Sequence, residues 1–249
     1  TDTGNPGAGA DQQFAPVSFA HVTPDGYLGL TTDLGSELVV IGLAIFTPFA
    51  EMKRYGGRTA QPTPAEEGSL RYHRIRSDWF HLFVAPVVAV RIHPRFYLGL
   101  GLSYVRTMMR LEFARDRKLR TGMIGASAPL YEDPAATERL SLTGAEDSFA
   151  FELGLLVRLP GNVDVGLSYR SKVAGVNLDH VQAEGDARVT RYEEATASWV
   201  TYRGRSRVAY ELPDSLQVGV KWTRKRWALL SSFEWERWSV HRRLSYTLT

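Results

Sequence analysis

The sequence predicts an all-β fold, an antiparallel transmembrane β-barrel of the outer membrane, and three observations carry this prediction. Apolar side chains recur at every second position through much of the chain, which places them on one face of a strand. No segment contains the roughly 20 consecutive apolar residues that a membrane helix needs. Short turns alternate with long connecting segments, as they do at the two rims of an outer-membrane barrel.

The clearest alternation covers residues 148–170. The odd positions of 149–159 are all apolar, whereas the even positions are mostly small or polar and include Glu152. After a turn at 160–162 the odd positions are apolar again, as far as Tyr169. Because successive side chains of a strand point to opposite faces, the two segments form a hairpin whose apolar face is expected to meet lipid.

The same pattern recurs in other segments, which are joined by recognisable turns. They are 14–32, 39–49, 79–92, 96–104, 216–222 and 227–235, with short turns at 33–36, 93–95 and 223–226. Long connections are expected at 51–78, 114–147 and 175–212. The total is about eight strands. A soluble sandwich also alternates, but its apolar face points inward and its turn lengths are not segregated in this way.

Both ends of the sequence bear on its domain organisation. Residues 1–10 lack the basic segment and apolar core of a signal peptide. Residues 244–249 stop within an alternating pattern. The expectation is one β-barrel domain over residues 1–249 that is incomplete and belongs to a larger barrel, so that the segment alone would have unpaired strand edges.

Composition and motifs argue against several function classes. The 30 Lys and Arg residues stand against 27 Asp and Glu residues and are scattered between strands, so nucleic acid is not an expected partner. The chain has no cysteine, and its histidines lack metal-ligand spacing, so no metal site is expected. Nucleophile-elbow and phosphate-loop motifs are absent from the sequence, so we expect no catalytic residues, no cofactor and no enzyme activity.

Several stretches carry a resemblance to a known family. The most specific is VGLSYRSKV at 165–173, and a second is LPDSLQVGV at 212–220, followed by WALL at 227–230 and WERWS at 235–239. Weaker matches lie at 41–49 and 85–89. In this order, over nearly the whole chain, they resemble the outer-membrane long-chain fatty-acid and aromatic-hydrocarbon transporter family.

The resemblance implies passive uptake of hydrophobic compounds, either long-chain fatty acids or aromatic hydrocarbons, across the outer membrane of a Gram-negative cell. Members of the family hold an N-terminal plug inside a larger barrel, and the plug and the C-terminal strands are expected to lie outside this sequence. The implied partners are a hydrophobic small molecule and outer-membrane lipid, and the complete protein is expected to be a monomer. The alternative is a structural or adhesion barrel of about eight strands, whose interior is filled by side chains and which transports nothing.

The resemblance also implies an opening in the barrel wall, because the family's third strand is kinked and lets ligand leave sideways. The matching strand is 39–49, with Gly42 in its interior and Pro48 at its outer end. Glycine weakens a strand and proline removes a ladder hydrogen bond, which favours a kink. The alternative is that Pro48 only ends the strand. Pro86 also falls within a strand, where it is expected to need a bulge or a sheet edge.

Two basic residues are candidates for ligand binding at the loop end of their strand. Arg170 and Lys172 fall on its polar face, where a cation can bind a carboxylate headgroup through charged hydrogen bonds. The alternative is that Arg170 pairs with Glu152 or Asp164 inside the barrel, as lumen charges commonly do.

Further candidates lie around the connection that follows residue 104. Arg106 and Arg110 are similar cations, although Arg106 continues the apolar register unless a bulge intervenes. Met108 and Leu130 are candidates for an apolar groove, because flexible and exposed aliphatic side chains adapt to hydrophobic ligands. The alternative is that the segment 123–140 packs on its own neighbours.

Overall fold

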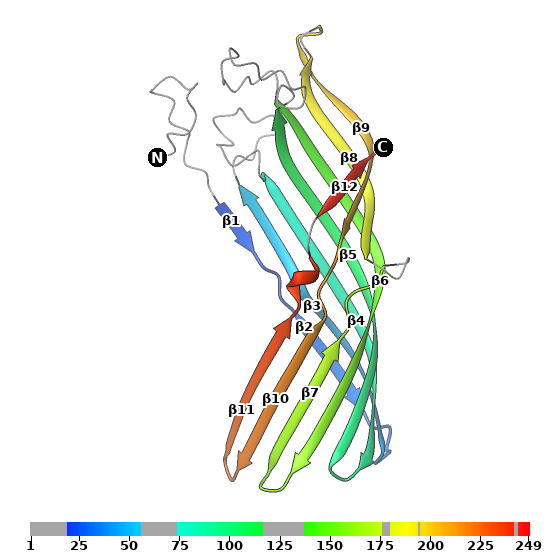
Figure 1. Ribbon diagram of the computed structural model, residues 1–249, viewed down its shortest axis with the longest axis vertical. Helices are drawn as coiled ribbons and strands as arrows, with labels where there is room; N and C mark the ends of the chain where they lie inside the picture. The colour runs from blue at the N-terminus through cyan, green and yellow to red at the C-terminus, as the bar shows by residue number, and fades with distance from the viewer. Residues whose placement is uncertain (1–18, 56–73, 117–136, 176–179, 194, 242–243) are drawn as a thin grey trace.

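The structure, a computed structural model, describes residues 19–55, 74–116, 137–175, 180–193, 195–241 and 244–249. Within these ranges, twelve strands form one antiparallel sheet that curves into a half-barrel (Figure 1). The strands are β1 Phe19–Val22, β2 Tyr27–Thr32, β3 Val39–Tyr55, β4 Arg76–His93, β5 Phe96–Asp116, β6 Thr137–Leu159, β7 Val163–Arg170, β8 Val181–Glu193, β9 Ser198–Tyr210, β10 Ser215–Arg224, β11 Trp227–Glu236 and β12 Ser245–Leu248. A short 3-10 helix, η3, covers Trp238–Val240. No helix among these residues is long and apolar enough to cross a membrane.

Several of the strands lie end to end along a neighbour. The main path is β1–β3–β4–β5–β6–β7–β10–β11, while β2 also pairs with β3, β8 pairs with β6 and β9, and β12 pairs with β9. The pairs β1/β2, β7/β8, β9/β10 and β11/β12 therefore each occupy a single position in the sheet. In the part of the chain that the structure describes, eight positions result, which confirms the expected number of strands.

Tight turns join the strands at the lower end of the sheet in Figure 1. The turn between β6 and β7 contains Gly161 and Asn162 with φ of 84° and 61°, values that glycine and asparagine adopt most readily. Beyond it Leu159 pairs with Val163, and the next hairpin closes where Arg224 pairs with Trp227. Both hairpins confirm the prediction from the alternation.

The convex face of the lower half, the region of β2, β7, β10, β11 and the adjoining parts of β3 to β6, is apolar. Phe149 is 48% exposed and Leu153 is 47% exposed, although both are large hydrophobic residues. Their neighbours Ala150 and Glu152 face the concave side, where Ser103 donates a hydrogen bond to Glu152. This exposure is expected for a lipid-facing surface and not for a protein core.

The upper half, formed by β1, β8, β9, β12 and the adjoining parts of β3 to β6, reverses this pattern. Its concave side is packed, with Leu142, Val181, Ala183 and Val208 fully buried. Phe113 of β5 contacts Tyr246 of β12 across the interior, at 5.8 Å between ring centroids. Apolar side chains therefore point inward in the upper half and outward in the lower half.

The reversal explains a wrong expectation about the connections. Residues 175–212 were expected as a long loop, but most of them form β8 and β9. Their outward positions are mainly charged and their inward positions apolar, so a search for outward apolar rows does not find them. β5 and β6 also extend into the segment 114–147, and β3 and β4 extend into 51–78.

Pro86 lies in the middle of β4 without a bulge. On the β3 side Pro86 is opposite Leu43. On the β5 side Ala85 and Pro86 are unpaired, but the register is the same at Val84 and at Val87. The missing N–H therefore leaves a local gap in the ladder. The expectation that Pro86 requires a bulge or an edge was wrong, because the exposed proline is tolerated at the cost of this gap.

Candidate ligand-binding site

Four of the eight strand positions are interrupted at one height, which we call the waist. The interruptions are residues 23–26, 171–180, 211–214 and 237–244, the last containing η3. Residues 171–180 and 211–214 lie at one level, because Tyr210 pairs with Val181 on one side of the break and Ser215 pairs with Arg170 on the other. Arg237 lies beside them, since its N–H donates to the Asp214 carbonyl. Figure 1 shows the offset between the two halves at η3.

At the same height β3 contains a β-bulge. Phe46 pairs with Phe83 and Phe49 pairs with His81, so Thr47 and Pro48 together oppose the single residue Leu82. A bulge leaves one residue out of the ladder, and proline suits that position because it has no N–H to donate. The bulge also brings both Phe46 and Phe49 to the concave face.

The neighbouring strand position is held to the bulge by few hydrogen bonds. The Thr47 backbone N–H donates to the Gly26 carbonyl at 3.3 Å, and the Thr47 hydroxyl donates to the Pro24 carbonyl at 3.2 Å. Gly42, by contrast, lies in a regular ladder opposite Thr31 and Val87. The irregularity of the strand is therefore at Thr47 and Pro48 and not at Gly42.

Arg170 extends from the end of β7 to the aromatic residues of β3 and β4. Its guanidinium carbon lies 5.9 Å from the centroid of the Phe46 ring and 5.6 Å from those of Phe49 and Phe83. The side chain is 15% exposed, and its Nη2 lies 3.9 Å from Oε1 of Glu234. A cation at this distance from several ring faces is attracted by them, so Arg170 and the three phenyl rings form one packed group.

This group borders a cavity of about 470 Å³ at the waist. The cavity is lined by Thr23, Asp25, Gly26, Tyr27, Phe46, Thr47, Pro48, Arg170, Gln217, Glu234 and Glu236. It lies beside the bulge and the interruption at 23–26. Two residues that the sequence singled out for different reasons, Pro48 and Arg170, therefore meet at one cavity.

Three other candidate residues lie away from the cavity. Arg106, Met108 and Arg110 occupy outward positions of β5, and the pairing of β5 with β6 continues without a bulge. Arg106 Nη1 lies 2.7 Å from Asp147, and Arg110 Nη2 lies 2.5 Å from Glu112. These three side chains are therefore not part of the cavity.

The remaining candidates are Lys172 and Leu130. Lys172 follows the end of β7, between the buried residues Ser171 and Val173, and it does not line the cavity. Leu130 lies outside the described residues. The alternative pairing of Arg170 inside the barrel has a different partner from the two considered, because the carboxylate nearest its guanidinium is Glu234.

A buried polar and aromatic cluster adjoins Phe49 on the upper side of the cavity. His81 Nδ1 lies 2.6 Å from the Phe49 carbonyl, and its Nε2 lies 2.8 Å from the Tyr210 hydroxyl. Since a carbonyl only accepts, Nδ1 carries the proton and Nε2 accepts from Tyr210. Trp79 and Trp238 pack on this cluster, with ring centroids 4.9 Å from Tyr210 and 5.6 Å from Phe49. The sequence did not reveal it, although His81 sits at an inward position of an alternating strand.

The described residues contain no group of three or more histidine and carboxylate side chains that could hold a metal ion. The lining of the cavity at the waist therefore combines the aromatic rings of Tyr27 and Phe46, one guanidinium, that of Arg170, and three carboxylates. Such a mixture of apolar walls and convergent polar groups is typical of a site for a small molecule.

Comparison with known proteins identifies the family. The model of the family described as outer membrane protein transport protein (OMPP1/FadL/TodX) matches residues 18–249. The chain belongs to this family. Like the rest of the OMPP1/FadL/TodX family, it is an outer-membrane protein of the Gram-negative type, and the family consists of transport channels.

Solved structures of similar fold agree with this membership. A Pseudomonas aeruginosa FadL homologue superimposes with a TM-score of 0.72 at 15% identity, over 91% of this chain and 51% of that structure. The CymD monoaromatic hydrocarbon channel gives 0.67 at 17%, over 93% and 60%. The Pseudomonas putida toluene transporter TodX gives 0.62 at 16%, over 90% and 59%.

The chain thus spans between 51% and 60% of the length of these three structures. At such low identities the likeness establishes the fold, an outer-membrane β-barrel of which the described residues form part. A comparison with curated protein sequences gave no match.

Proposed function

We propose that the protein takes up neutral hydrophobic compounds, small aromatic hydrocarbons in particular, by passive movement through the cavity at the waist. The observation that carries this proposal is the position of the cavity, which is lined by the aromatic rings of Tyr27 and Phe46 and lies beside an irregular part of the wall. Aromatic ligands gain from edge and face contacts with such rings beyond simple burial. Membership in a family of transport channels supports the same class of function.

The charges around the cavity favour a neutral ligand over a fatty acid. Asp25, Glu234 and Glu236 line the cavity together with one cation, Arg170. The guanidinium of Arg170 is already covered by rings and lies near Glu234. A carboxylate ligand would meet more negative than positive side chains there, and like charges at close range disfavour binding.

The wall beside the cavity supports a sideways exit. Between β1 and β2 the chain leaves the ladder at residues 23–26, and β3 bulges opposite them. The hydrogen bonds from Thr47 to Gly26 and Pro24 cross this place. Each such bond contributes about 0.5 to 1.5 kcal/mol net, so opening the wall here requires much less than separating a regular ladder.

The choice between ligand classes can be tested by titration. The protein in lipid nanodiscs would be titrated with toluene and with a long-chain fatty acid, alongside a Glu234→Gln/Glu236→Gln variant. The expected result is tighter binding of toluene by the unaltered protein, and a gain for the fatty acid alone in the variant. An Asp33→Asn/Glu37→Gln variant, altered in the exposed turn before β3, is the matched control for lost negative charge. Tighter binding of the fatty acid by the unaltered protein would contradict the proposal.

A further inference from the structure

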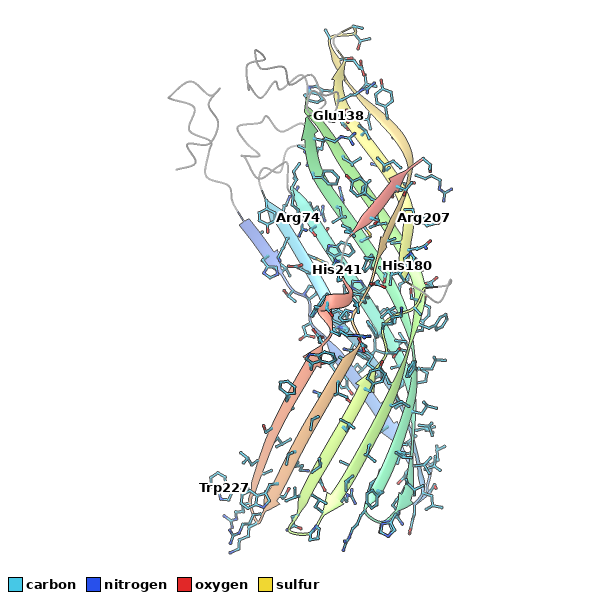
Figure 2. The ribbon with its side chains drawn as sticks, viewed as in Figure 1. Arg74, Glu138, His180, Arg207, Trp227 and His241 are labelled. Atoms are coloured by element: carbon cyan, nitrogen blue, oxygen red, sulfur yellow. The ribbon has the colours of Figure 1, made fainter. Side chains whose placement is uncertain are left out.

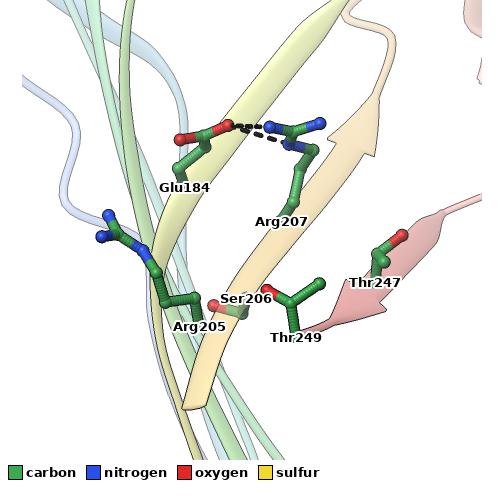
Figure 3. A pocket seen from close by; sticks show the side chains of 6 residues that line it. All are labelled: Glu184, Arg205, Ser206, Arg207, Thr247 and Thr249. Carbon is green, nitrogen blue, oxygen red and sulfur yellow. Dashed lines mark hydrogen bonds and ion pairs between the residues drawn. The ribbon is translucent and has the colours of Figure 1, made fainter.

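The short helix η3 lies between two strands that are each paired with a neighbour. β11 ends at Glu236, which is still paired with β10, and β12 begins at Ser245, which is paired with β9. Figure 3 shows β12 beside β9, where Thr247 is opposite Arg207. The position of η3 is therefore set from both ends.

Both flanks of η3 are also bonded to the interruption at 211–214. The Arg237 backbone N–H donates to the Asp214 carbonyl at 3.1 Å, and Arg237 Nε lies 2.7 Å from Oδ1 of Asp214. At the other flank, His241 Nδ1 lies 3.0 Å from the Glu211 carbonyl. Figure 2 shows His241 at the level between the two halves of the sheet. These bonds hold η3 in a defined place at the waist.

Trp238 of η3 contacts the bulge of β3 across the concave side. Its ring centroid lies 5.6 Å from that of Phe49 with an angle of 81° between the planes, an edge-to-face arrangement that aromatic pairs prefer. The indole Nε1–H donates to Oε2 of Glu236 at 2.8 Å. Glu236 lines the cavity, and Phe49 directly follows the cavity-lining Pro48. The indole therefore joins the end of β11 to the bulge of β3.

Phe49 is held mainly from the concave side. Its carbonyl accepts a hydrogen bond from His81, and its ring lies against the guanidinium of Arg170 as well as against the indole of Trp238. Toward the neighbouring strand position, the described hydrogen bonds of the bulge are the two from Thr47. The position of the bulge thus depends more on contacts inside the barrel than on the ladder beside it.

We infer that Trp238 is a positioning residue that keeps the sideways exit closed, an inference that rests on the proposed function. Opening the wall beside Thr47 moves the bulge away from η3, which stays bonded to 211–214. The contact between Trp238 and Phe49 then breaks, so it stabilises the closed form alone. Removing the indole ring shifts the population toward the open form. His81 and Arg170 still hold Phe49, so the fold is retained.

Uptake of radiolabelled toluene by cells that carry the full chain tests this role. Trp238→Leu keeps an apolar side chain without a ring, and uptake should be about two- to tenfold faster, as the loss of one aromatic pair implies. Trp238→Phe restores a ring opposite Phe49 and should return uptake to within about twofold of the original rate. Phe49→Leu removes the same pair from its other member and should accelerate uptake as Trp238→Leu does. It also keeps the test decisive if Trp238→Leu does not fold.

The matched control is Trp235→Leu. Trp235 is 48% exposed, as Trp238 is, but it lies on the convex face, opposite Leu216 in the regular ladder of β10 and β11. Its replacement removes an indole of equal exposure from the same part of the chain and should leave the rate of toluene uptake unchanged. An equal acceleration in Trp235→Leu would show that the effect does not depend on the contact with Phe49.

A second measurement reports on the bulge without transport. The chain has no cysteine, so Thr47→Cys supplies a single thiol at the wall. A lipid-soluble maleimide should label this thiol faster when Trp238→Leu is also present. Labelling of Leu43→Cys, in the regular ladder of the same strand, should not change with Trp238→Leu.

Two results would overturn the role of Trp238. One is slower or unchanged uptake in both Trp238→Leu and Phe49→Leu, and the other is labelling of Thr47→Cys at the same rate with and without the indole. Absence of toluene uptake by the unaltered chain would contradict the proposed function instead. In that case the labelling rates still decide whether Trp238 holds the bulge.

Discussion

The guanidinium carbon of Arg170 lies 5.6 Å from the centroid of the Phe83 ring. One residue ends β7 and the other lies in the middle of β4, so the contact crosses the concave side of the sheet. An interaction of this kind contributes about 0.5 to 2 kcal/mol, with the higher values where water is excluded. It holds the guanidinium against the rings at the edge of the cavity, which Arg170 lines.

Replacing Arg170 with Met should leave toluene affinity within about threefold of its original value. Met keeps an apolar stem of similar length, and a neutral ligand has no headgroup that needs the cation. Titration of the variant in nanodiscs with toluene measures this. Lys172→Met is the control, since Lys172 does not line the cavity. A toluene affinity reduced by an order of magnitude in Arg170→Met alone would show that the guanidinium binds the ligand.

Cross-linking the wall at the bulge should block uptake. Gly26 and Thr47 lie opposite each other, and residues directly opposed in adjacent strands are close enough for a disulfide. The chain has no cysteine of its own, so a Gly26→Cys/Thr47→Cys variant contains the only thiols. Uptake of a radiolabelled aromatic by cells should fall on oxidation and return on reduction.

The control for this cross-link is Leu28→Cys/Ile45→Cys, a pair in the regular ladder between β2 and β3. A disulfide there joins strands that are already hydrogen-bonded and should leave uptake unchanged. Equal uptake by the oxidised and reduced forms of the bulge variant would rule out a sideways exit at Thr47.

An arginine at Leu155 should destabilise the barrel by about 2 to 4 kcal/mol, because a charge near the middle of the apolar band meets hydrocarbon. Leu155 lies between Leu98 and Leu167 on the convex face. Leu156→Arg is the control, because Leu156 faces the concave side next to Asp164. Unfolding in urea from lipid vesicles measures both. A similar loss of stability in the two variants would contradict the assignment of the faces.

Removing the hydroxyl of Tyr210 should destabilise the waist. In Tyr210→Phe the buried His81 Nε2 loses its donor, and an unsatisfied buried polar atom costs about 1 to 3 kcal/mol. Tyr104→Phe is the control, since its hydroxyl donates to Asp147 at an exposed position, where water replaces it. In thermal unfolding, the melting temperature should fall clearly more in Tyr210→Phe than in Tyr104→Phe. If Tyr104→Phe lost as much stability as Tyr210→Phe, burial of the histidine would not be the cause.

The lower half of the fold could be predicted from the sequence because its pattern is local. The hairpins of β6 with β7 and of β10 with β11 follow from period-two alternation and tight turns. β8 and β9 were missed because they lie above the apolar band. There the outward side chains meet headgroups and water, so the apolar row points inward and the rule for lipid-facing strands no longer holds.

The candidate site was predictable only in part. Pro48 and Arg170 each stand out by residue type, but 121 positions of sequence order separate them and nothing local indicates that they meet. Their meeting depends on the curvature of the whole sheet and on the bulge, which changes the face on which Phe49 appears. Arg106 and Arg110 also stand out by residue type, but they occupy outward positions of β5 and do not line the cavity.

The interruptions at the waist have a consequence for how the chain tolerates changes in length. Residues inserted into or deleted from 23–26, 211–214, 237–244 or the part of 171–180 beyond Ala174 need not alter pairing in either half, because no named strand includes them. Ser171 and Ala174 still form backbone hydrogen bonds with β6. β3, with its bulge, and β4, β5 and β6 run through the waist as single strands. A one-residue deletion within β5 would turn every outward side chain beyond it to the inside. Variation in length should therefore concentrate in the four interrupted positions, while the lengths of the four through-going strands stay fixed.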